Sequence, residues 1–145
     1  MRTAHFPSLK LGAGALALLL ALPAFASSAA APALAEHHAH GVAWVSGGIG
    51  ADESSALKSE ASSYPLSMVF SAGKHDEYLA DVRVVVKDHA GKTVLNTVSA
   101  GPLMLVRLPA GDYRVSAASD GRTLQRDARV AGHGDTQVSF HWPTA

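Results

Sequence analysis

The fold of this chain follows from one stretch of its sequence, Leu108-Pro109-Ala110-Gly111-Asp112-Tyr113-Arg114-Val115. Pro109 fixes φ at the second position of a tight turn, and Gly111 relaxes the fourth. We expect Gly111 to need a positive φ or a close approach of backbone. Tyr113 then opens a strand in which alternate side chains point inward, and its hydroxyl should return to nearby backbone, as at the corners of other sandwiches.

Short strands lie on both sides of this turn. Turn signals separate them, above all Asp88-His89-Ala90-Gly91, with Asp first and Gly last, and the hairpin pair Asp120-Gly121. The connections are too short for crossover helices, so we predict a mainly β fold, a seven-stranded antiparallel β-sandwich whose turns alternate between its two ends. The predicted strands span residues 66–70, 81–87, 93–99, 103–108, 112–119, 122–130 and 136–142.

The alternation along these strands also predicts which side chains form the core. Five apolar residues should be buried: Val84, Val86, Val115, Val138 and Phe140. Arg126 departs from the pattern, because it shares its parity with Leu124 and Ala128 and should therefore point inward. A β-bulge at that point, or an acidic partner, would reconcile Arg126 with the strand.

Residues 42–65 follow a different pattern. A short strand over 42–46 ends at a glycine-rich turn, and Asp52 is the expected N-cap of one short N-terminal helix. Leu57 and Tyr64 fall on one face of this helix, which should stop before Pro65.

The N-terminus carries the features of an export signal. Arg2 and Lys10 supply positive charge, an apolar run follows, and Ala24-Phe25-Ala26 fits the small-x-small rule for signal peptidase. Ala33-Leu34-Ala35 is a second cut site, and the apolar run is short for a bilayer span. We therefore predict a cleaved signal peptide over 1–26, a periplasmic or secreted protein, and no integral membrane span after cleavage.

Histidines are the one unusual feature of the composition. Residues 27–41 are rich in Ala, Ser and Pro and are expected to form a disordered linker. Within them His37, His38 and His40 follow Glu36, and imidazoles bind transition metals. We favour a solvated tail over a weak metal site, because such a tract lacks supporting partners.

A second candidate metal or ligand site depends on the fold. If turns alternate between the two ends of the sandwich, the turns at 88–91, 109–111 and 132–135 share one end. Two histidines and two aspartates would then meet there: Asp88, His89, His133 and Asp135. Solvated loop residues are the commoner outcome, and no cofactor is expected. At the other end, Tyr78 is placed to stack on a sugar or a peptide.

Composition excludes several function classes. The chain has 145 residues, enough for one domain, and no cysteine, which rules out disulfides and thiol chemistry. Of its 12 basic residues two lie in the leader, leaving 10 against 12 acidic ones, so nucleic acid is not an expected partner. No Gly-x-Ser-x-Gly, His-Glu-x-x-His or phosphate-binding glycine loop occurs, and we expect no enzyme.

The motifs together resemble a known family. The strand and turn over 84–94, the stretch 108–113 with Pro109 and Tyr113, and the turn glycines Gly91 and Gly121 are similar to the carboxypeptidase regulatory-like domain. That resemblance covers about residues 66–142 and implies a prealbumin-like (transthyretin-like, Ig-like) sandwich. It further implies an accessory or binding module without peptidase activity, as in small exported proteins of Gram-negative bacteria.

Three functions remain open on the sequence. The first is a non-catalytic exported binding or accessory module with a protein or glycan partner in the cell envelope. The second is a periplasmic metal-binding protein that uses its histidines. The third is a carbohydrate-binding module, which requires an exposed aromatic pair; Trp44, Tyr64 and Tyr78 are the candidates.

Overall fold

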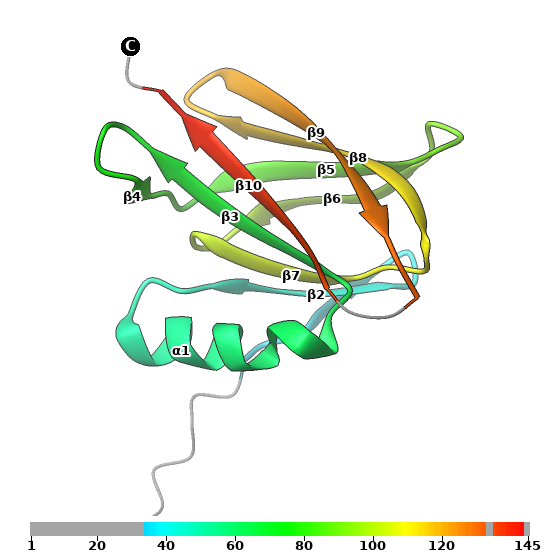
Figure 1. Cartoon of the computed structure of the whole chain (residues 1–145), viewed down its shortest axis with the longest axis horizontal. Coiled ribbons are helices and arrows are strands. Elements are labelled where there is room, and N and C mark those ends of the chain that lie inside the picture. The colour runs from blue at the N-terminus through cyan, green and yellow to red at the C-terminus, as the bar shows by residue number, and fades with distance from the viewer. Residues whose placement is uncertain (1–33, 133–134, 144–145) are drawn as a thin grey trace, which may run out of the picture.

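The computed structural model describes residues 34–132 and 135–143, which form two β-sheets and one α-helix (Figure 1). The helix α1 spans Ala51–Glu60 and continues into a short 3₁₀ helix, η1, over Ala61–Ser63. The strands are β1 (His37–Ala39), β2 (Val42–Gly47), β3 (Leu66–Ala72), β4 (Glu77–Tyr78), β5 (Val82–Asp88), β6 (Thr93–Ser99), β7 (Leu103–Arg107), β8 (Gly111–Ser119), β9 (Arg122–Val130) and β10 (Thr136–Trp142).

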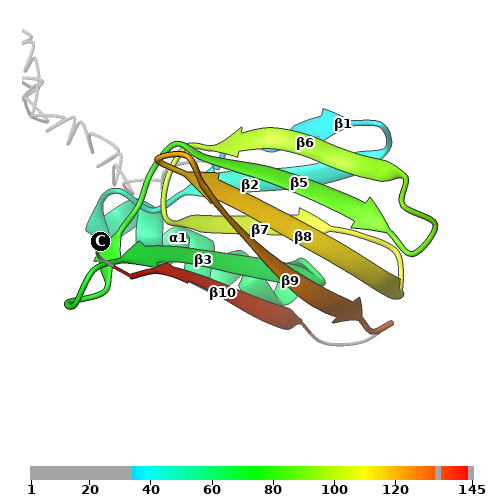
Figure 2. The ribbon, with the colours of Figure 1, turned by 90° about the horizontal axis from the view of Figure 1, so that it is seen from above.

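The two sheets lie face to face. One has the order β1-β2-β7-β3-β10, with β4 paired to β3, and the other has the order β6-β5-β8-β9 (Figure 2). The predicted class, a mainly β, sandwich-like fold with one short helix, is confirmed in this form. The predicted count of seven sandwich strands is too low, because the short strand expected over 42–46 joins the six-stranded sheet as β2 and because β1 and β4 were not expected.

The expectation of purely antiparallel pairing is wrong at one place. β10 pairs with β3 in parallel, from Thr136 opposite Leu66 to Trp142 opposite Ala72. Short turns make consecutive strands antiparallel, but β3 and β10 are far apart in the sequence, at Leu66–Ala72 and Thr136–Trp142, and no turn joins them directly. Aromatic contacts stabilise the β3–β10 pair, since Phe140 stacks on Phe70 with ring centroids 5.8 Å apart.

The core lies between the sheets, where the strand alternation placed it. Val84, Val86, Val115 and Phe140 are fully buried and Val138 nearly so, which confirms the predicted inward faces. Neither of the two explanations expected for Arg126 is correct. The β8–β9 register contains no bulge, and Arg126 has no acidic partner among the described residues. Instead its guanidinium lies 5.9 Å from the centre of the Phe140 ring while the side chain stays exposed.

The helix α1 covers the outer face of the six-stranded sheet. Leu57, Tyr64, Val45 and Leu105 form a second apolar cluster there. The helix begins after Gly50, without a side-chain cap, so Asp52 lies in its first turn instead of capping it. It ends before Pro65, as predicted. In Figure 1 the helix and the four-stranded sheet lie on opposite sides of the six-stranded sheet.

The turn over residues 108–111 has the predicted tyrosine corner, but its glycine does not have the predicted conformation. The Tyr113 hydroxyl donates a hydrogen bond of 2.7 Å to the Pro109 carbonyl. Gly111 has no positive φ, and a Cβ there would lie 3.6 Å from the Tyr113 ring, an ordinary contact, so the special requirement expected at Gly111 is wrong. Gly91 and Gly121 do adopt positive φ values, +81° and +75°.

The prediction of a disordered linker over residues 27–41 is also wrong for the last of these residues. His37–Ala39 pair with β2 in antiparallel fashion, through a tight turn in which His40 and Gly41 both have positive φ. The predicted signal peptide and residues 27–33 lie outside the described residues. In the part of the chain that is described, no helix is long and apolar enough to cross a membrane.

Candidate functional site

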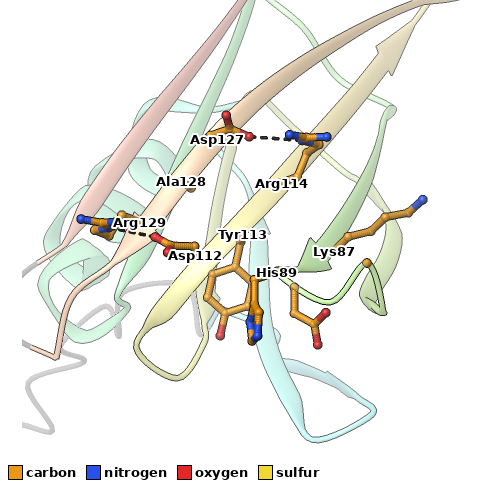
Figure 3. Close-up of a pocket in the computed structure, with 10 residues that line it drawn as sticks. Lys87, His89, Asp112, Tyr113, Arg114, Asp127, Ala128 and Arg129 are labelled. Atoms are coloured by element: carbon orange, nitrogen blue, oxygen red, sulfur yellow. Dashed lines mark hydrogen bonds and ion pairs between the residues drawn. The ribbon is translucent and has the colours of Figure 1, made fainter.

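A shallow hollow of about 570 Å³ lies on the outer face of the four-stranded sheet. Its side chains come from β5, β8, β9 and the turn after β5 (Figure 3). Ten residues line it: Lys87, Asp88, His89, Gly91, Asp112, Tyr113, Arg114, Asp127, Ala128 and Arg129.

Strand register gathers the charged residues of this hollow. Lys87 on β5 lies opposite Arg114 on β8, and Arg114 in turn lies opposite Asp127 on β9. Asp112 and Arg129 face each other in the same way, two residues further along. Their neighbours Val86, Tyr113, Val115 and Ala128 are buried, so alternation turns the charged side chains outward.

Two ion pairs hold the arginines of the hollow. Arg114 Nε donates to Asp127 Oδ1 at 3.2 Å, and Arg129 Nε donates to Asp112 Oδ1 at 2.8 Å. All four side chains are more than half exposed, so these pairs add little to stability. In both pairs the aspartate accepts from the arginine Nε, and the terminal Nη groups donate no hydrogen bond to a carboxylate among the described residues.

The formal charges of the hollow balance, since three cations (Lys87, Arg114 and Arg129) lie among three carboxylates (Asp88, Asp112 and Asp127). The hydrogen bond from Arg129, together with its charge and that of His89, lowers the pKa of Asp112, and Asp112 in turn raises the pKa of Arg129. Lys87 faces the like charge of Arg114 across the strand pair, an unfavourable arrangement. No carboxylate lies within ion-pair distance of Lys87 in residues 34–132 or 135–143.

The carboxylate of Asp88 is engaged by its own turn. Its Oδ1 accepts hydrogen bonds from the backbone N–H groups of Ala90, at 3.0 Å, and Lys92, at 2.9 Å. The Gly91 N–H donates to the Asp88 carbonyl at 3.0 Å, which closes the turn with Asp first and Gly last, as predicted. Asp88 therefore shapes the loop that presents His89 to the hollow.

The four predicted metal ligands are not brought together among the described residues. Asp88 and His89 share the hollow just described, but Asp135 lines a different one beside Leu57 and Lys58 of α1. His133 lies outside the described residues. Within the described ranges, no group of three or more histidine, cysteine, aspartate or glutamate side chains is placed to hold a metal ion.

The histidine tract holds the N-terminal segment in place. His38 Nε2 lies 3.0 Å from Glu36 Oε1, and the Tyr64 hydroxyl donates to the other Glu36 oxygen. Burial and this bond to Glu36 raise the pKa of Tyr64 to about 12, while the bond lowers the pKa of Glu36. His37 stacks on Trp44, with ring centroids 5.5 Å apart. The sequence pattern gave no sign of these long-range contacts.

The aromatic pair required of a carbohydrate-binding module is not formed by the three candidates. Trp44 and Tyr64 are buried in the two apolar clusters, and only Tyr78 is exposed, at 64%. Tyr78 and Ile49 line a separate hollow of about 460 Å³ beside the glycine-rich turn.

Comparison with known families adds one finding. The sequence profile of a family described as a Rhizobiales growth-associated tandem repeat domain matches residues 65–141. The chain belongs to this family. The match covers more than half of the chain, from the start of β3 into β10. Of the resemblance to the carboxypeptidase regulatory-like domain, the coarser part is supported, namely a small β-rich, sandwich-like domain. No curated protein matches the chain.

Proposed function

We propose that the protein is a non-catalytic, exported binding module of the periplasm or cell envelope, and that its ligand lies on the outer face of the four-stranded sheet. The observation that carries this proposal is the hollow around Lys87, Arg114 and Arg129. It combines an open position with two arginines whose Nε groups pair with neighbouring aspartates.

The chemistry of the hollow suits binding better than turnover. Its side chains are mainly charged hydrogen-bond donors and acceptors, and the Tyr113 hydroxyl is already bonded to Pro109. The floor is a sheet, so strand register fixes the backbone positions from which the charged side chains project.

Membership of a growth-associated family fits a module that is exported to the envelope, where growth adds new material. The export itself rests on the charged start, apolar run and small-residue cut site of the leader. The tyrosine corner at Tyr113 supports a prealbumin-like relationship, which we keep as part of this proposal.

Cell fractionation and envelope sedimentation test the proposal. The processed protein should be found in the periplasmic fraction and should sediment with purified envelopes. A Lys87→Glu/Arg114→Glu double variant should lose at least about tenfold in envelope binding, because charged hydrogen bonds to the ligand are replaced by repulsion.

The matched control is Ser139→Glu, which adds a negative charge on the exposed side of β10, away from the hollow. It should bind as the wild type does. Absence of envelope binding in the wild type, or equal binding by all three proteins, would contradict the proposal.

A further inference from the structure

We infer that the ligand of this hollow is an acidic polysaccharide, recognised through its carboxylates by Lys87, Arg114 and Arg129 and through its hydroxyls by Asp112 and Asp127. The inference rests on the proposed function and names the class of ligand for the same site.

The three cations form a line across three strands. Lys87 and Arg114 are direct cross-strand neighbours, and Arg129 lies one row further on the next strand. Direct neighbours on a sheet face have Cβ atoms about 5 Å apart, and diagonal ones about 7–8 Å. Such a line suits an extended ligand with several acidic groups better than it suits one small anion.

Arg114 and Arg129 have the geometry to bind carboxylates. A guanidinium offers its donors in a planar fork that matches a carboxylate in bidentate fashion. Asp127 and Asp112 occupy the Nε sides of Arg114 and Arg129 at 3.2 and 2.8 Å, which leaves the terminal Nη groups to a ligand. In Figure 3 the two pairs lie on the same face, with Lys87 next to Arg114.

The two aspartates select against anions without hydroxyl groups. Asp112 keeps its charge, because Arg129 lowers its pKa, and a carboxylate can only accept hydrogen bonds. A sugar hydroxyl beside the acid group can donate to it. The polyphosphate backbone of DNA has no such donor at each unit, so an acidic polysaccharide fits better than DNA.

Relief of repulsion adds to the attraction. Lys87 and Arg114 are like charges in directly opposed positions, an arrangement that weakens the sheet when nothing lies between them. A carboxylate placed over both would remove this penalty. An anionic group of the ligand at this point would therefore be attracted by both cations.

Calorimetric titration of the mature protein with galacturonic acid oligomers, and with the same oligomers as methyl esters, tests the inference. The acid should bind and the ester should bind at least about tenfold more weakly, since each charged hydrogen bond is worth more than one such factor. Arg129→Lys keeps the charge but loses the fork, and should also weaken binding of the acid.

Two variants remove one positive charge each from the same strand. Lys87→Gln lies in the hollow and should weaken binding, whereas Arg83→Gln lies on the same outer face outside the hollow and should not. Equal effects of the two variants, equal binding of acid and ester, or equal binding of a DNA oligomer would overturn the inference. Envelope sedimentation without any affinity for the acidic oligomers would overturn it while leaving the proposed function standing.

Discussion

At the scale of single residues, close approach between distant segments decides which side chains are tolerated. Gly101, after β6, lies against the backbone of Gly47 at the end of β2, and a Cβ would come within 2.8 Å of Gly47 Cα and nearer still to its carbonyl. Gly111 lies in the most recognisable turn, yet a Cβ there meets only ordinary contacts. The prediction from the sequence singled out Gly111, which is wrong, and missed Gly101, because no local pattern reports a contact between segments so far apart.

Gly101→Ala should therefore lower the free energy of unfolding by about 1–3 kcal/mol, because two backbones must move apart to admit the methyl group. Gly111→Ala is the matched control and should change it by less than about 1 kcal/mol. Urea denaturation measures both. A larger loss at Gly111 than at Gly101 would contradict the observed packing.

Tyr64 should make the free energy of unfolding depend on pH in the alkaline range. Its pKa is raised from 10.0 to about 12 by burial and by Glu36, so the folded state holds the phenolic proton more tightly than the unfolded state. The resulting stability is fully present below pH 10 and is lost as pH rises towards 12. Melting temperatures should fall over this range, and more steeply in the wild type than in Tyr64→Phe. Parallel pH profiles for the two proteins would show that Tyr64 is not the group involved.

At the scale of elements, the sequence predicted which segments are strands but not all of their partners. Period-two alternation located β5, β8 and β10 because each buries one face. The partner of β10 is β3, more than sixty residues earlier, and only the packing of both against one core selects it. β1 was missed because two exposed histidines carry no apolar alternation.

Phe140→Ala tests the β3–β10 pair. The ring is fully buried and stacks on Phe70 and Trp142, so its loss should cost about 3–5 kcal/mol. Ser139→Ala, the exposed neighbour on the same strand, should be close to neutral. Thermal melting compares the two. A Phe140→Ala protein with an unchanged melting temperature would mean that the last strand has the wrong register.

At the scale of the whole molecule, the two sheets differ in what covers them. The six-stranded sheet carries α1 on its outer face, whereas the four-stranded sheet presents Lys87, Arg114 and Arg129 to solvent (Figures 1 and 3). The sequence predicted that these positions point outward. It could not predict that they form one hollow, because that depends on the order β5-β8-β9 and on which sheet the helix covers.

If the proposed signal peptide is cleaved, the ordered N-terminal segment favours the first of the two predicted cleavage sites. Leu34 packs against the α1 cluster and Glu36 accepts the Tyr64 hydroxyl. A cut after Ala35 would remove Leu34 from this cluster, so the mature protein should begin at Ser27, after Ala26. Mass spectrometry of the exported protein reads the new terminus directly. A mature chain that starts at Glu36, or one that keeps residues 1–26, would contradict this prediction.

The outer face of the four-stranded sheet is the proposed binding surface of this protein. The most direct test of this proposal is NMR of the labelled mature protein, titrated with polysaccharide purified from the cell envelope. We predict that signals of Lys87, Arg114 and Arg129 shift in a saturable manner, while those of Ser139 and His141 on β10 stay in place. Shifts confined to Ile49 and Tyr78, or no shifts at saturating polysaccharide, would contradict the account.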